Sequence, residues 1–157
     1  MRRVAFVAMS GALAFGSLQA QVPMQTAQTD FSYWPVSPGA WTYRAVTGGS
    51  EAAFVDGAGA TRMVIACGKL TRLVTLSRIS AAPASSLSFW TSSDSRNLAS
   101  RFDQPSGRII AQVGGMDPLL DAIAFSRGRF AVSMPGSPAL VMPAGTEIAH
   151  VVEDCRA

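Results

Sequence analysis

Histidine and cysteine are scarce in this 157-residue chain, which contains one histidine, His150, and two cysteines, Cys67 and Cys155. The cysteines are far apart, so no C-x-x-C redox pair exists. No G-x-S-x-G nucleophile elbow occurs, and the glycine-containing stretches GGSEAAF and DGAGATR lie between expected strands rather than before a helix. These absences exclude a thioredoxin-type motif, a serine-hydrolase elbow and a phosphate-binding loop.

An excess of charge of one sign is also missing. The chain has 13 Lys and Arg residues against 10 Asp and Glu residues, a formal net charge of +3. Arg2 and Arg3 lie in a segment that we predict to be removed, which leaves 11 basic against 10 acidic residues. So small a surplus predicts no general attraction to nucleic acid or to anionic lipid. We therefore expect no nucleic-acid partner.

The only long apolar run stands at the N-terminus. The segment MRRVAFVAMSGALAFGSLQA combines two arginines, an apolar stretch and a small final residue, which is typical of a secretory signal peptide cut after Ala20. An uncleaved anchor is the alternative, but the run is short and no second run of about 20 apolar residues follows. We predict a signal peptide over residues 1–20, a flexible leader over 21–30 and a single β-rich domain over 31–157. The location is then periplasmic or secreted, with no transmembrane segment after cleavage.

Short alternating and β-branched runs follow residue 41 and predict strands. The mature chain is long enough to bury a hydrophobic core. The polar stretch 94–107 has turn chemistry, and the segment 31–41, rich in aromatic residues and proline, is expected to be irregular but packed. The predicted strands cover residues 41–48, 61–67, 70–79, 86–92 and 108–113, with a short strand and its Gly-rich turn in 51–59, followed by a hairpin of 129–134 and 139–142.

Two short helices are predicted in the C-terminal third. Asp117 suits the cap of the first helix, Pro118 its first position and Gly128 its exit. Asp121 is expected to point away from the buried face of this helix. A second helix, capped by Thr146, closes the chain.

The final helix carries Cys155 on its apolar face. At about 100° per residue, His150 lies on the opposite side of the helix from a stripe made of Ile148, Val151, Val152 and Cys155. A zinc site made from Cys67, His150 and Cys155 would need its ligands to converge at about 2.0–2.3 Å from one ion. We therefore expect no metal and no cofactor.

Export favours a disulfide between Cys67 and Cys155, because thiols pair in oxidising compartments. Such a bond would join residues 88 positions apart. The predicted fold class is thus mainly β (α+β): a β-sandwich or meander-type sheet with two short helices in the C-terminal third, linked by one disulfide.

Few residues offer catalytic chemistry. Asp117 and Asp121 are the best carboxylate pair, but a helix cap and a solvated side chain explain them without acid–base work. His150, turned outward among carboxylates, is a poor general base because it lacks an enclosed site. We therefore assign no catalytic residue.

Candidate binding residues are clearer. The segment FSRGRF places Arg127 and Arg129 around Gly128, a candidate anion- or partner-binding turn because guanidinium forks suit carboxylate and phosphate. The alternative is that both arginines only complement the C-terminus of the preceding helix. The polar stretch 91–101 is either a binding loop or a plain exposed loop. A candidate aromatic surface consists of Tyr33, Trp34 and Trp41.

Several segments resemble known proteins. DPLLDAIAFSRGRFAV, LVMP and EIAHVVEDCR, with EAAF, IAC and RLVTLSR upstream, resemble small secreted bacterial proteins, themselves uncharacterised, that share SRGRF and a C-terminal EDCR. More remotely, the order of strands, late helix, hairpin and final cysteine-bearing helix is similar to the invasion-associated locus B family. The resemblance implies an exported, β-rich protein that is not an enzyme, and it supplies no catalytic residues.

We therefore expect a non-catalytic envelope or periplasmic accessory or binding protein, with an unknown protein or envelope component as its partner. A small β domain with a disulfide presents loops on a rigid scaffold. The same scaffold also suits the main alternative, a proteinaceous inhibitor of a secreted enzyme such as lysozyme. A small hydrolase is the remaining alternative.

Overall fold

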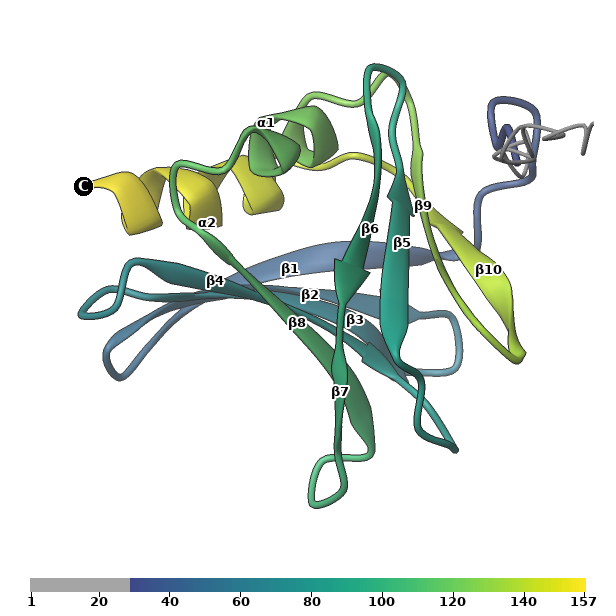
Figure 1. Ribbon diagram of the computed structural model, residues 1–157. Coiled ribbons are helices and arrows are strands. Elements are labelled where there is room, and N and C mark those ends of the chain that lie inside the picture. The colour runs from purple at the N-terminus through teal and green to yellow at the C-terminus, as the bar shows by residue number, and fades with distance from the viewer. Residues whose placement is uncertain (1–28) are drawn as a thin grey trace, which may run out of the picture.

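The computed structural model describes residues 29–157. The predicted signal peptide, residues 1–20, and residues 21–28 of the predicted leader lie outside this described part of the chain. Residues 29–157 form ten strands and two helices, arranged as two antiparallel sheets with the helices beside the smaller one (Figure 1). The mainly β fold class with two helices in the C-terminal third is confirmed.

The larger sheet has six strands in the order β1–β2–β3–β4–β8–β7. Its inner face is apolar, as shown by Phe54, Ile65 and Leu76, whose side chains are fully buried. Alternate residues of each strand face the other way, and most of those are partly exposed. The strands are β1 Gly39–Val46, β2 Gly49–Asp56, β3 Thr61–Gly68, β4 Leu73–Ile79, β7 Arg101–Asp103 and β8 Arg108–Gly114.

The smaller sheet has four strands in the order β10–β9–β5–β6. It packs on the inner face of the larger sheet, so that Phe89 and Phe130 are fully buried and Trp41 stacks on Phe130 with ring centroids 6.1 Å apart. The fold therefore combines a meander, β1 to β4, with sandwich packing. The strands are β5 Ser86–Trp90, β6 Ser95–Ala99, β9 Phe130–Met134 and β10 Ser137–Met142.

The prediction that residues 94–107 form a polar stretch of turns is wrong, because this segment contains β6 and β7. The two strands follow one another with only Ser100 between them, and its N–H donates to the Ser85 carbonyl at 3.0 Å. The chain thus passes from the edge of one sheet to the edge of the other (Figure 1). The β3–β4 turn is also longer than predicted, and Leu70, expected in a strand, is 97% exposed in it.

Helix α1 spans Pro118–Ala124 and begins as predicted, with Asp117 as its cap. It ends earlier than predicted, because Phe125 and not Gly128 is the C-cap residue. Helix α2 spans Thr146–Arg156, and its N-cap is Gly145, which makes no side-chain capping bond. The prediction that Thr146 caps this helix is wrong by one position. Within residues 29–157, neither helix is both long and apolar enough to cross a membrane.

Helix α2 lies across the inner face of the larger sheet, beside the smaller sheet (Figure 1). The predicted stripe is its buried face, since Ile148, Val151, Val152 and Cys155 are all nearly inaccessible to solvent. Cys155 meets Cys67 at the end of β3, and the two form the predicted disulfide with their Cα atoms 5.5 Å apart. The disulfide therefore joins the last helix to the end of β3, one of the middle strands of the larger sheet.

Candidate functional site

Residues 31–38, which we call the aromatic strap, cross the outer face of the smaller sheet. Phe31 is buried against Ala131 and Val141 of β9 and β10, and it contacts Trp34 and Trp90 edge-on at ring-centroid distances of 5.0 and 6.1 Å. Farther along, the Ser37 N–H donates to the Val141 carbonyl at 2.8 Å. The strap is thus held at both ends, by a buried ring and by a bond to an edge strand.

Between these two attachments the strap exposes large side chains. Tyr33 is 94% exposed and Trp34 is 45% exposed. Segment 31–41 was expected to pack as a whole, and this expectation fails for Tyr33. Aromatic residues are enriched at protein interfaces, so two adjacent exposed rings beside a buried one form a candidate binding surface.

Trp41 does not belong to this surface, which corrects the predicted aromatic set. Its side chain is only 7% exposed, packs on Phe54 and Phe130, and donates from Nε1 to the Pro143 carbonyl at 2.8 Å. The physical reason is strand parity, because β1 turns Trp41 toward the inner face of the sheet. Trp90, which sequence reasoning missed, underlies the strap instead.

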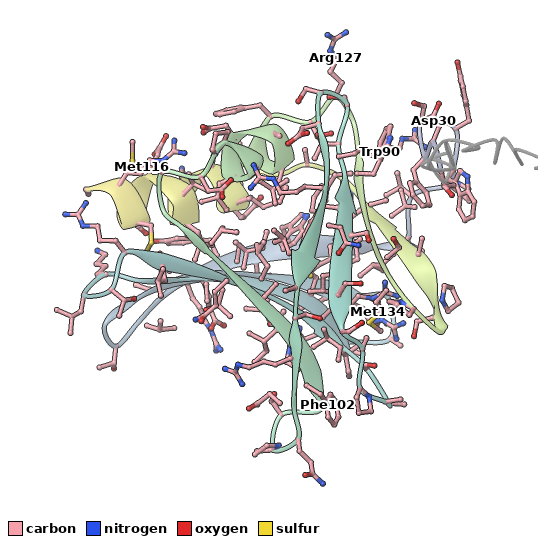
Figure 2. The ribbon with its side chains drawn as sticks, in the orientation of Figure 1. Asp30, Trp90, Phe102, Met116, Arg127 and Met134 are labelled. Atoms are coloured by element: carbon pink, nitrogen blue, oxygen red, sulfur yellow. A yellow bond between two sulfur atoms is a disulfide. The ribbon has the colours of Figure 1, made fainter. Side chains whose placement is uncertain are left out.

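The two arginines of SRGRF lie on the loop that follows α1. Arg129 donates from Nη1 to the Trp34 carbonyl, so this arginine joins the strap. Arg127 is exposed, and among residues 29–157 its side chain forms no ion pair. Figure 2 shows Arg127 projecting from the tip of the molecule, beside the β5–β6 turn. Neither arginine lies in the last turn of α1, so complementing the helix C-terminus does not explain them.

The prediction that residues 91–101 form a polar loop is wrong in part, because 95–99 form β6, but the turn at residues 91–94 supports this tip. The Thr91 N–H and hydroxyl both donate to the Asp94 carbonyl at 2.8 Å and close a tight turn. The Ser92 N–H then donates to the hydroxyl of Ser126 at 2.9 Å, and the Arg127 N–H donates to the hydroxyl of Ser92 at 2.9 Å. Two loops therefore fix the backbone from which Arg127 projects.

We call Tyr33, Trp34, Arg127 and Arg129 the aromatic–arginine face. The structure brings three of its members together directly, because Tyr33 neighbours Trp34 and Trp34 accepts a bond from Arg129. Arg127 belongs to this face through the loop it shares with Arg129, two residues farther along, and it has no ion-pair partner among the described residues. A partner with carboxylate or phosphate groups beside apolar surface matches this combination.

The carboxylates that sequence reasoning considered for catalysis are both engaged elsewhere. Asp117 accepts from the Leu119 N–H at 2.9 Å and pairs with Arg96 at 2.8 Å. Asp121 was expected to point into solvent, but it faces α2 and accepts from both terminal nitrogens of Arg156 at 2.8 and 3.0 Å. Both aspartates therefore hold elements in place.

His150 lies exposed on α2, with its ring edge-on to Tyr43 at 5.6 Å. The Tyr43 hydroxyl donates to Asp154 at 2.7 Å, which lowers the pKa of Asp154 and raises the pKa of Tyr43. Cys67 and Cys155 are used by the disulfide. Within residues 29–157, no group of three or more His, Cys, Asp or Glu side chains is arranged to hold a metal ion.

In comparisons with known proteins, no family model, no curated protein and no solved structure matches the chain. The resemblance to secreted bacterial proteins stated above therefore stays a prediction. The candidate site is assigned from its geometry.

Proposed function

We propose that this protein is a non-catalytic binding protein, exported to the envelope or periplasm, that contacts its partner through the aromatic–arginine face. The observation that carries the proposal is the exposure of Tyr33 and Trp34 on a strap that the sheet holds in place. Aromatic and arginine side chains are enriched among the residues that dominate binding energy at protein interfaces. The partner that fits is a protein or envelope component with anionic groups next to apolar surface.

The strap supports this proposal because it is ordered before any partner arrives. Phe31 anchors one end and the Ser37–Val141 hydrogen bond anchors the other. Little conformational entropy is then lost when Tyr33 and Trp34 bind a partner, because their side chains have few rotatable bonds. A flexible aromatic segment would lose part of its contact energy on docking.

We propose that the protein is not an enzyme because the side chains considered for catalysis make structural contacts. Asp117 caps a helix and pairs with Arg96, and Asp121 pairs with Arg156. His150 lies on α2, and Tyr43 is its aromatic neighbour. Export is supported by the predicted signal peptide and by the disulfide, because disulfides persist in oxidising compartments.

The proposal is tested with a photo-crosslinking amino acid placed at Tyr33 in cells that produce the exported protein. The matched control carries the same group at Leu70, which is 97% exposed in the β3–β4 turn. We expect a discrete crosslinked species from position 33 and none from position 70. The captured partner is then purified and its affinity measured with wild-type protein and with Trp34→Ala and Arg127→Glu.

Each of these two substitutions is expected to cost about 2 kcal/mol of binding free energy, a weakening of about 30-fold. Equal affinity of all three proteins would contradict the assignment of the aromatic–arginine face. Stoichiometric loss of a captured enzyme's activity would assign the inhibitor role instead of the accessory role. Substrate turnover that disappears in Asp121→Ala or His150→Ala would overturn the non-catalytic proposal.

A further inference from the structure

Arg78 is a buried cation on the inner face of β4, where its neighbours on the same face are apolar. Its side chain is 6% exposed. The guanidinium reaches across the sandwich, donating from Nη1 to the Val132 carbonyl of β9 at 2.7 Å and from Nη2 to the Pro138 carbonyl of β10. Arg78 thus joins the two sheets through neutral acceptors alone.

The charge of Arg78 has no counter-charge in the described part of the chain. No carboxylate of residues 29–157 forms an ion pair with it. Burial, together with the smaller effect of the nearby positive charge of Arg62, lowers the pKa of Arg78 to about 10. The group remains protonated at neutral pH, and a buried charge without a partner is costly.

Arg62 is brought to the same place by an irregularity in the sheet. In the β2–β3 pairing, Phe54 faces Met63 and Val55 faces Thr61, so Arg62 is an extra residue at a β-bulge. Bulges re-aim side chains and are frequent beside binding sites. The carboxylate that Arg62 reaches is Asp56, at 3.7 Å, a long contact. The other oxygen of Asp56 accepts the N–H groups of residues 58 and 60.

The two arginines line one hollow of about 290 Å³, which we call the Arg62–Arg78 pocket. It lies between the β3–β4 side of the larger sheet and the β9–β10 hairpin, and Figure 2 shows Met134 at this hairpin. Of the residues from 29 to 157, no acidic side chain lines it. Its walls are Arg62, Arg78, Ser80 and Ser137, with Ile79 and Met134 among the apolar contacts.

We propose that the Arg62–Arg78 pocket binds a phosphate group, either as inorganic phosphate or as a small phosphate monoester. Two cations match a dianion, and guanidinium groups bind phosphate oxygens in pairs. A carboxylate has fewer acceptor oxygens and less negative charge than a phosphate dianion to offer the two guanidinium groups. The volume is at the lower limit of small-molecule sites. The apolar side chains of Ile79 and Met134 line the pocket and would contact a small ester substituent.

A bound phosphate would bridge β3 and β4 to the β9–β10 hairpin, because the lining residues come from both sheets. Binding to the folded state alone stabilises it, so the thermal midpoint should rise with phosphate concentration. The site is separate from the aromatic–arginine face, and the proposal does not depend on that face having a partner.

The test uses the mature, disulfide-bonded protein and compares inorganic phosphate, glycerol phosphate and acetate with chloride at constant ionic strength. Isothermal titration calorimetry and NMR of the arginine Nε–H groups follow binding. We expect saturable binding of phosphate, with shifts confined to Arg62 and Arg78, and weaker binding of acetate. Glycerol phosphate that binds more tightly than phosphate assigns the monoester, and the reverse order assigns the free ion.

Arg62→Gln is the decisive variant, because Arg62 is partly exposed and its loss leaves the core intact. It should weaken phosphate binding by at least about tenfold, whereas Arg101→Gln, which removes an arginine that is 64% exposed on β7, should leave it unchanged. Arg78→Gln should abolish binding, and if that variant does not fold, Arg62→Gln still decides. Non-saturable binding, equal loss in Arg62→Gln and Arg101→Gln, or acetate binding as tightly as phosphate would overturn the proposal.

Discussion

At each end of the sandwich an arginine side chain links neighbouring elements. One arginine bonds a carboxylate, and the other bonds only neutral carbonyl groups. At the helical end, Arg156 of α2 donates to both oxygens of Asp121 on α1. At the hairpin end, Arg78 of β4 donates only to the carbonyls of Val132 and Pro138. The helical end also carries the disulfide, so it is closed both covalently and by paired charges.

The direction of the two pKa shifts expresses the same difference. The hydrogen bonds that Arg156 donates to Asp121 raise the pKa of Arg156, while burial lowers the pKa of Arg78 to about 10. The chain supplies a counter-charge to Arg156, and among the described residues it supplies none to Arg78. The helical end is therefore complete on its own, whereas Arg78 at the hairpin end has a positive charge that the proposed phosphate would neutralise.

The largest effect should come from opening the helical end. Replacing both cysteines, as Cys67→Ser with Cys155→Ser, removes a link between residues 88 positions apart. We expect a loss of about 2–5 kcal/mol in the free energy of unfolding, measured by urea denaturation under oxidising conditions. Amide hydrogen exchange should show the loss of protection concentrated in α2. Unchanged stability would mean that packing alone holds this helix.

A smaller pair of effects should separate the two arginine contacts. Arg78→Met leaves two carbonyls without their donor in a buried place, which we expect to cost about 1–3 kcal/mol. Asp121→Asn removes a pair in which Asp121 is 46% exposed, which should cost less than about 1 kcal/mol. Denaturation curves of both variants in phosphate-free buffer measure the difference. A greater cost for Asp121→Asn would reverse the comparison.

The smallest effect concerns pH, through the bond between Tyr43 and Asp154 that also fastens the helical end. The hydroxyl of Tyr43 lowers the pKa of Asp154, so this contribution to stability is present above pH 4 and is lost as the pH falls through the lowered value. The same bond raises the pKa of Tyr43, so its contribution is present below pH 10 and is lost as the pH rises through the raised value. The variant Tyr43→Phe should lack both dependences.

The measurement is the thermal midpoint of wild-type protein and Tyr43→Phe across the pH range. The difference between the two should be constant near neutrality and should shrink toward both extremes. A difference that is the same at every pH would show that the hydroxyl contributes through packing and not through its bond to Asp154.

Much of the fold was predictable because alternation and helical phase are local properties of the sequence. The alternating runs predicted most strands of the larger sheet, and the phase of the last helix placed Cys155 on its buried side, opposite His150. The strands β6 and β7 were missed, because their residues are mostly polar and pairing with β5 and β8 makes them strands. Their pairing is a tertiary effect, which local propensity does not contain.

The candidate sites were less predictable, since they depend on which face each residue meets. Trp41 and Tyr33 lie in one aromatic run, yet the sandwich buries the first and leaves the second exposed. Arg78 did leave a signal, because it continues the alternation of Val74 and Leu76 on the inner face of β4. An arginine on the apolar face of a strand is a cue for a buried charge, but whether an aspartate faces it is settled only by the packing of the sheets.

Because the chain crosses between the two sheets, as it does at Ser100, proteolytic cleavage should affect both sheets. Along the chain, β5 and β6 of the smaller sheet come between strands β4 and β7 of the larger sheet. In the same way, β7 and β8 of the larger sheet come between β6 and β9 of the smaller one. No single cut in the backbone between β1 and β10 therefore leaves both sheets whole. A protease that nicks one loop would not release an independently folded fragment, and the two layers should be lost together or kept together.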